Sequence, residues 1–174
     1  MCLKGKKVVL VIDKNFEDSE AIYPYFRLKE EGVEVIIAGP IKATVFNGKW
    51  GYPLKSDISI DDLNAFDYDG VIVPGGYAPD LLRRYPQVLL FVHELFNQGK
   101  LVASICHGPW VLISAKILSG KRVTCVPAIK DDVINAGASY FDEEVVVDGN
   151  LVTSRNPFDL PAFLKAIIAF LGKK

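Results

Sequence analysis

Short, continuously apolar runs alternate along this chain with longer stretches of helical character. The apolar runs are rich in β-branched residues, which is typical of strands covered on both faces; they span residues 8–12, 33–38, 70–73, 101–105 and 123–126. The sequence predicts helices over residues 16–31, 86–98, 109–118 and 158–171, and a glycine closes each of the first three. Between residues 40 and 68 it predicts only a loop with short strand pieces and a helical turn.

The alternation of strands and helices predicts one α/β domain spanning residues 1–174. Strands joined by helices run parallel in one sheet, which gives a mainly parallel, three-layer α/β/α sandwich. Near the end, two short apolar runs flank Asp148-Gly149-Asn150, which predicts a β-hairpin because glycine supplies the positive φ of the turn. Half of the 174 residues are hydrophobic, which is enough to bury about 70% of the unfolded surface in one core.

Composition and charge argue against several classes of partner. The chain carries 20 basic and 21 acidic side chains, a formal net charge of −1, without long runs of either sign. Electrostatic capture of nucleic acid or of an anionic membrane is therefore not expected. Residues 1–7 lack the apolar core of a secretory signal, and no apolar run reaches the roughly 18 to 20 residues needed to span a bilayer. We expect a cytoplasmic protein that acts on a small or neutral partner.

The three cysteines are Cys2, Cys106 and Cys125. They are odd in number, far apart, and without the paired spacing of a zinc site or a disulfide scaffold. Reduced thiols are therefore expected, and neither a metal nor a cofactor. Cys125 lies inside an apolar strand and Cys2 near the terminus, so neither is a candidate for chemistry.

Cys106 is the candidate nucleophile. Ser104-Ile105-Cys106-His107-Gly108 places it between a predicted strand and a helix, with small residues that permit a sharp turn, as in a nucleophile elbow. At a helix amino terminus the partial positive charge favours the thiolate, which is the attacking species. A free cysteine is more commonly a small buried hydrophobe, but this context favours reactivity.

Two further groups follow predicted strands and should meet Cys106, because ligands bind beyond the carboxyl ends of parallel strands. Gly75 and Gly76 either form a simple turn or bring N–H groups to an oxyanion. Glu17 and Glu20 lie three residues apart at the start of a helix, where they either cap it or face the thiol. A buried Glu20 would have a raised pKa and could donate a hydrogen bond to the thiolate.

The histidines bear on one alternative. A triad glutaminase also has a cysteine elbow, but it needs a histidine far downstream, and this chain contains only His93 and His107. His93 lies mid-helix beside Glu94, where a solvated surface position is the more common role. Any catalytic histidine should therefore be His107, although side chains of neighbouring residues at a turn tend to diverge.

These features resemble the ThiJ/PfpI superfamily, and within it the PfpI-type intracellular proteases. The matching stretches span almost the whole chain in the family's order; they are residues 15–20 with 22–25, Pro74 to Asp80, Ile105 to Pro109, Asp131 to Ala138 and Val145 to Asn150.

The resemblance implies a flavodoxin-like sandwich, related to the class I glutamine amidotransferase fold, in which Cys106 is the nucleophile and His107 its partner. Glu20 matches the family's thiol-contacting glutamate. Gly75, Gly76 and the backbone at His107 match oxyanion-binding positions. Asp80 matches an acidic residue that reaches the site from a neighbouring subunit, so a homo-oligomer, either a dimer or a hexamer, is expected. Val126 departs from the Tyr or His that family members often carry there, and Trp110 could narrow the pocket mouth.

The resemblance leaves three functions open. The first is a PfpI-type cysteine hydrolase that cleaves peptides, with Cys106 attacking a carbonyl carbon. The second is a deglycase or glyoxalase that acts on methylglyoxal and its adducts; both reactions begin with thiolate attack on a carbonyl. The third, non-catalytic, is a redox sensor or chaperone in the stress response, in which Cys106 is oxidised and Glu20 binds the product.

Overall fold

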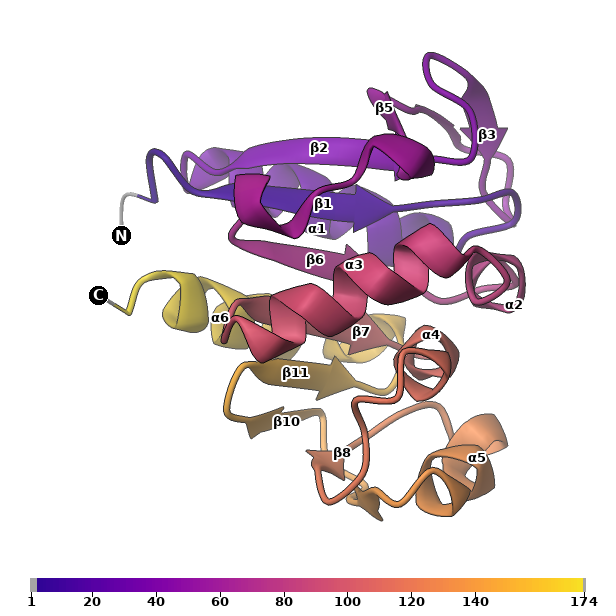
Figure 1. The fold of residues 1–174 in the computed structure, drawn as a ribbon, viewed down its shortest axis with the longest axis vertical. Coiled ribbons are helices and arrows are strands. Elements are labelled where there is room, and N and C mark those ends of the chain that lie inside the picture. Colours follow the sequence, from indigo (N-terminus) through magenta and orange to yellow (C-terminus); the bar gives the residue numbers. More distant parts are fainter. Residues whose placement is uncertain (1–2, 174) are drawn as a thin grey trace.

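A seven-stranded sheet lies at the centre of the structure, a computed structural model that describes residues 3–173 (Figure 1). The strand order is β10-β11-β7-β6-β1-β2-β5. Strand β10 pairs antiparallel with β11, and the other pairs are parallel. The prediction of a mainly parallel α/β sandwich is therefore confirmed.

The strands of this sheet are β1 (Lys7–Val11), β2 (Glu34–Gly39), β5 (Ile58–Ser59), β6 (Gly70–Val73), β7 (Leu101–Ile105), β10 (Val145–Asp148) and β11 (Leu151–Ser154). Two small sheets pair β3 (Val45–Asn47) with β4 (Pro53–Lys55), and β8 (Arg122–Val123) with β9 (Ser139–Tyr140). The α-helices are α1 (Asp18–Glu30), α2 (Ala78–Leu82), α3 (Pro86–Asn97), α4 (Pro109–Ser114), α5 (Lys130–Asn135) and α6 (Leu160–Leu171), and short 3-10 turns cover Ile60–Asp62, Ala65–Asp67, Pro127–Ile129 and Pro157–Asp159.

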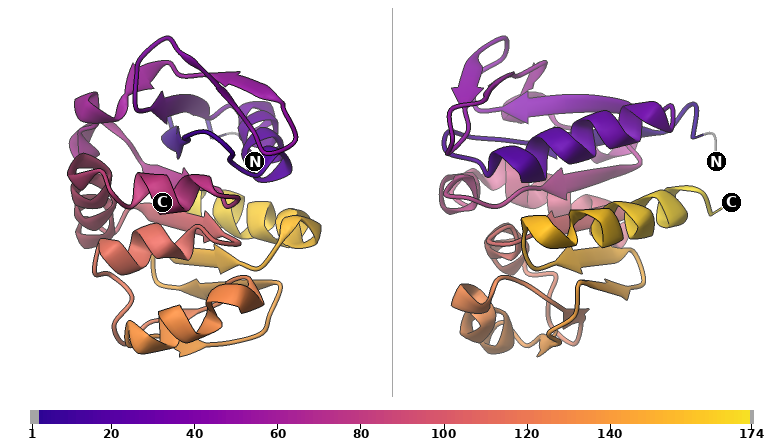
Figure 2. Two further views of the ribbon diagram at one scale, coloured as in Figure 1. Left: turned by 90° about the vertical axis from the view of Figure 1, so that its right-hand side faces the viewer. Right: turned by 180° about the vertical axis from the view of Figure 1, so that it is seen from behind.

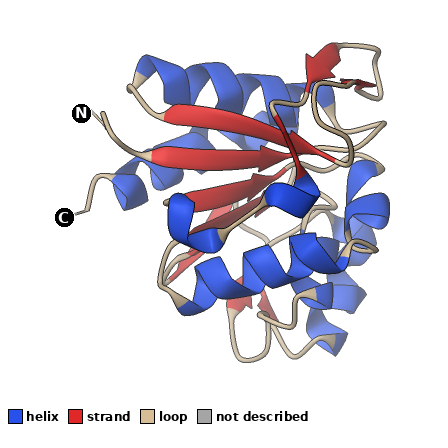
Figure 3. Ribbon diagram, turned by 45° about the horizontal axis from the view of Figure 1, so that its top comes forward, coloured by secondary structure: helices blue, strands red, loops and turns tan. Residues whose placement is uncertain are grey.

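Helices cover both faces of the sheet, as the two views in Figure 2 and the colouring in Figure 3 show. Helices α1 and α6 lie side by side on one face, and α3 and α4 cover the other. The central strands β6 and β7 are buried at every residue because both of their faces meet helices. This packing explains why their sequences are continuously apolar.

The carboxyl ends of the parallel strands meet at one edge of the sheet, on the right in Figure 1. From β1 the chain continues to β2 on one side of the sheet, and from β6 it continues to β7 on the opposite side. The direction in which strands are added therefore reverses between the neighbours β1 and β6. In open α/β sheets such a switch point leaves a crevice for ligands. The residues after β1, β6 and β7 are therefore placed to form one site.

One predicted strand is wrong. Residues 123–126 do not form a strand of the main sheet, because β8 ends at Val123 and pairs with β9. The amide of Thr124 donates to Thr153 Oγ1 at 2.9 Å, and that of Val126 donates to the Cys106 carbonyl at 3.2 Å. The position beside β7 belongs instead to β11, the second strand of the predicted hairpin.

Two helices were missed and one was predicted too long. Helix α4 ends at Ser114 rather than at residue 118, and Lys116 beyond it has a φ of 58°, a left-handed conformation that a helix cannot contain. Helices α2 and α5 have only five and six residues, too short for a helical repeat to show.

Among residues 3–173, no helix combines the length and the apolar character needed to cross a membrane.

Candidate active site

Cys106 lies directly after β7 on a strained turn. Its φ is 61°, an unfavourable left-handed value for a residue with a side chain. Gly108 makes the turn possible, since a Cβ there would lie 2.5 Å from the carbonyl oxygen of Val73. The Cys106 amide donates to the Ser154 carbonyl at 3.1 Å, so β11 fixes the turn from one side. The predicted elbow geometry is therefore present.

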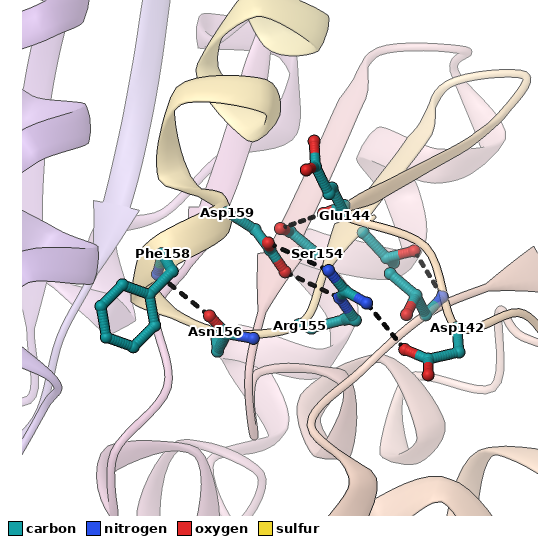
Figure 4. Close-up of polar contacts among 9 residues, drawn as sticks. Asp142, Glu144, Ser154, Arg155, Asn156, Phe158 and Asp159 are labelled. Carbon is teal, nitrogen blue, oxygen red and sulfur yellow. Dashed lines mark hydrogen bonds and ion pairs between the residues drawn. The ribbon is translucent and has the colours of Figure 1, made fainter.

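A polar cluster fixes the end of β11 in turn, as Figure 4 shows. The Arg155 guanidinium donates to Asp159 at 2.8 and 3.1 Å and to Asp142 at 2.8 Å. Ser154 Oγ donates to the Glu144 carbonyl at 2.6 Å. These bonds tie the segment after β11 to helix α6 and to the segment before β10, so they support the strand on which the Cys106 turn rests.

His107 contacts the nucleophile. Its Nδ1 lies 3.3 Å from Cys106 Sγ, although neighbouring side chains often diverge at a turn. Burial lowers the pKa of His107, and the positive charge of Lys49 acts in the same direction. Both effects favour the neutral imidazole, which is the form that can accept the thiol proton.

Glu20 is fully buried behind the thiol, on the first turn of α1. Its Oε2 accepts the Gly75 N–H at 2.7 Å. A Cβ on Gly75 would lie 2.6 Å from Glu20 Oε2 and 3.0 Å from Cys106 Sγ, so only glycine fits between the two. Among the described residues no hydrogen bond of standard geometry reaches Glu20 Oε1, so this is the oxygen left for the sulfur.

Burial raises the pKa values of both Glu20 and Cys106, and each group affects the other. Burial raises the pKa of Glu20 to about 8, the Gly75 N–H opposes this, and the charge of Glu17 adds to it. Burial also raises the pKa of the Cys106 thiol, to about 12, and the negative charge of Glu20 adds to that effect. Glu20 is therefore mainly a neutral carboxyl at pH 7, and in this form it no longer opposes a thiolate.

The N–H groups that favour negative charge come from Gly76 and His107. Both act on Cys106 Sγ and lower the pKa of the thiol. Gly75 was also predicted as an oxyanion donor, but its amide donates to Glu20, so Gly76 and the amide of His107 remain the candidates for that role. Gly76 has a φ of 76°, and a Cβ there would lie 2.5 Å from the Asn15 carbonyl.

A cavity of about 220 Å³ opens over the sulfur. It is lined by Glu17, Lys49, Gly76, Tyr77, Cys106, His107 and Trp110. Trp110 contacts the His107 ring edge-on at 5.2 Å between centroids, so it lies beside the nucleophile, and its effect on the width of the mouth stays a prediction. Val126 is half-buried and packs against the core, so it supplies no polar group here, and Glu20 and His107 remain the candidates for proton transfer.

Glu17 is the N-cap residue of α1, but its side chain makes no capping bond and lines this cavity. It accepts from Trp50 Nε1 at 3.2 Å and from Lys49 Nζ at 3.4 Å. The loop between β3 and β4 that carries these two residues is held by buried Asp18, which accepts the amides of Trp50 and Tyr52 at 2.9 and 2.8 Å.

Sequence reasoning missed Lys49 because it lies in the weakly patterned segment between residues 40 and 68. No sequence pattern points to Lys49; the feature that locates its loop is buried Asp18, whose hydrogen-bond donors lie outside α1 and are seen only in the structure. Such a carboxylate indicates that another segment docks there.

The remaining candidates lie apart from the thiol. Asp80 lies half-buried on α2 and pairs with Arg84, which follows the end of that helix, so its role from a neighbouring subunit stays a prediction. His93 Nδ1 lies 3.0 Å from the Ala115 carbonyl on an exposed helix surface. Cys125 is fully buried. Cys2 lies outside the described residues. Within residues 3–173, no three His, Cys, Asp or Glu side chains gather to hold a metal ion.

Comparison with known proteins agrees with this geometry. Residues 6–170 match the DJ-1/PfpI family. The chain is 48% identical over 165 residues to deglycase PH1704 of Pyrococcus horikoshii, covering 95% of this chain and 99% of the relative. It is 42% identical to YraA of Bacillus subtilis, named as a candidate cysteine protease, covering 91% and 94%. Such enzyme names agree with the prediction of an enzyme.

A crystal structure from Anabaena variabilis, a two-domain protein with DJ-1/ThiJ/PfpI-like and ferritin-like domains, superposes with a TM-score of 0.94 at 46% identity. The match covers 96% of this chain and 48% of that protein, so the chain spans about half of its length. With the elbow, the buried glutamate and the sheet order all in place, the chain belongs to the DJ-1/PfpI family.

Proposed function

We propose that this protein is a cysteine-dependent deglycase that removes methylglyoxal from its adducts with amines. The observation that carries the proposal is the pairing of Cys106 with two proton-transfer groups: His107 lines a cavity of about 220 Å³ over the sulfur, and Glu20 is buried behind the thiol. A cavity of this size suits a small carbonyl compound. Conversion of a dicarbonyl adduct needs several proton transfers beside the nucleophile, and both groups are placed for them.

The reaction can be written so that it balances. An adduct of methylglyoxal and an amine takes up one water and gives the free amine and lactate. The amine leaves with a proton, which restores the aldehyde, and Cys106 Sγ then bonds to the aldehyde carbon while its carbonyl electron pair becomes an alkoxide. A proton moves from this carbon to the neighbouring carbon, so the first is oxidised to a thioester and the ketone is reduced to an alcohol. Water then cleaves the C–S bond and returns the thiol.

Each proposed role follows from the geometry. His107 Nδ1, 3.3 Å from the sulfur, accepts the thiol proton. The N–H groups of Gly76 and His107 stabilise negative charge on sulfur or alkoxide. Glu20, with a pKa raised to about 8, exchanges a proton readily near neutral pH and carries the transfer between the two carbons.

The relatives favour this function over the peptidase that the sequence analysis placed first. PH1704 is named as a deglycase, and YraA as a candidate protease. A non-catalytic redox sensor is less well supported, because these relatives carry the names of enzymes.

The test compares wild type with Cys106→Ser and with Cys125→Ala, the matched variant of the other described cysteine. Lactate formation from methylglyoxal and amine release from a preformed adduct should disappear in Cys106→Ser and persist in Cys125→Ala. Casein cleavage is measured in parallel. Cys106-dependent cleavage of casein without lactate formation would replace the deglycase by the peptidase, and no Cys106-dependent turnover of any substrate would exclude both.

A further inference from the structure

A second cavity, of about 350 Å³, adjoins the cavity over Cys106, and the Trp110 side chain lines both. Arg83 at the end of α2 and Asp132 and Asn135 of α5 are among its other lining residues. The Trp110 ring lies 5.2 Å from that of His107, which itself contacts the nucleophile. The indole therefore forms a wall along which a substrate could extend from one cavity to the other.

The Arg83 guanidinium is held in place through its Nε, while its two terminal amino groups stay free among the described residues. Its Nε donates to Ser114 Oγ at 2.9 Å, and its central carbon lies 5.6 Å from the centre of the Trp110 ring. Within residues 3–173, neither of its terminal amino groups has a hydrogen-bond or ion-pair partner. Such a planar pair of N–H groups matches the two oxygens of a carboxylate.

Asp132 supplies the opposite charge to the same cavity. Its Oδ2 accepts Trp110 Nε1 at 2.7 Å, and its Oδ1 has no partner in the described part of the chain. In that part Arg83 and Asp132 also form no ion pair with each other, although both line the cavity. The free amino groups of Arg83 and the free oxygen of Asp132 therefore offer a positive and a negative partner in one cavity. Together they complement a zwitterion.

We propose that this second cavity is a subsite for the head group of a free α-amino acid, an inference that rests on the proposed function. The α-carboxylate binds Arg83 and the α-ammonium binds Asp132. The amino acid's side chain runs along Trp110 and presents its glycated end to Cys106. A lysine within a protein carries neither charged group, so the subsite selects adducts of free amino acids.

The kinetic test compares methylglyoxal adducts of Nα-acetyl-lysine, which keeps the carboxylate, and of Nα-acetyl-lysine methylamide, which lacks it. Wild type should prefer the first by about tenfold in kcat/KM, as expected for a charge-assisted pair of hydrogen bonds. Arg83→Gln should reduce this ratio to about one, and thermal melting checks that the variant is folded. The matched control is Arg122→Gln, because Arg122 also stacks on an aromatic ring, Phe141 at 4.8 Å, but lines neither cavity. An equal ratio in wild type and Arg83→Gln would overturn the inference.

A binding test keeps the subsite separate from the reaction. Calorimetry on Cys106→Ser should show L-lysine binding about tenfold more tightly than Nα-acetyl-lysine or cadaverine, each of which lacks one charged group. Asp132→Asn should remove the preference over Nα-acetyl-lysine. Equal affinities for the three compounds would sink the subsite even if turnover is found. Absence of Cys106-dependent turnover would instead remove the proposed deglycase, and the binding result would still decide the subsite.

Discussion

At the scale of single residues, the unusual feature is a neutral carboxyl, Glu20, buried against a thiol. Its pKa in the folded state, about 8, lies above the ordinary value of 4.5 that an unfolded chain would show. Between these two values the folded protein binds more protons than the unfolded one, so Glu20 lowers the free energy of unfolding as the pH rises.

The change that tests this is Glu20→Gln, which keeps the shape and an acceptor for the Gly75 N–H but cannot titrate. In a Cys106→Ser background, urea unfolding should show the parent losing stability relative to Glu20→Gln as the pH rises from 5 to 8, by at most about 1.4 kcal/mol per pH unit. This pH-dependent loss of stability should be absent below about pH 4, where Glu20 is neutral in both the folded and the unfolded state. Parallel stability curves would mean that Glu20 is ionised in the folded state.

His107 should control how fast Cys106 reacts. Because burial keeps the thiol protonated, a nearby base must accept its proton, and Nδ1 lies 3.3 Å away. His107→Ala retains the backbone N–H and removes only the imidazole, so alkylation of Cys106 by iodoacetamide at pH 7 should slow at least about tenfold. Intact mass measures the rate, with Cys106→Ser as the blank. An unchanged rate would remove His107 as the base.

At the scale of elements, the turn after β6 depends on Gly76. Its φ of 76° resembles the 70° of Gly99, but a Cβ at Gly76 would meet backbone atoms at 2.5 Å, whereas nothing lies within 4 Å of one at Gly99. Gly99→Ala should cost about 1 kcal/mol, the strain of the left-handed conformation alone. Gly76→Ala should cost more than about 2 kcal/mol and abolish lactate formation. Equal costs in urea unfolding would show that the turn relaxes without disturbing the site.

Strands and helices could be predicted from the sequence where one physical effect dominates. Strands β6 and β7 were found to the residue because burial on both faces makes them continuously apolar. Residues 123–126 are also mostly apolar, yet the amides of Thr124 and Val126 donate to Thr153 and to the Cys106 carbonyl, which no local pattern encodes. Cys106, His107 and Glu20 were found from strand ends and the family resemblance, whereas Lys49 and the free edge of Arg83 depend on how distant segments pack.

At the scale of the whole molecule, the open question is whether Asp80 completes the site of a neighbouring subunit. Within the chain Asp80 is half-buried, and among the described residues its side chain is bound only to Arg84. If it acts across an interface, Cys106→Ser and Asp80→Ala are each inactive alone, but a mixed assembly contains sites with both residues intact. Equal mixing with random pairing should restore about a quarter of the wild-type rate.

The measurement is lactate formation after the two variants are unfolded, mixed and refolded together. A mixture of Cys106→Ser with Arg84→Ala is the control for loss of the ion pair alone. Both chains of this mixture retain Asp80, so every intact Cys106 should be active. Refolded wild type sets the scale, and light scattering gives the mass of each assembly. A mixed sample that stays inactive, or a monomer with full activity, would confine Asp80 to its ion pair with Arg84 and leave Glu20 and His107 as the acid–base groups of a site built from one chain.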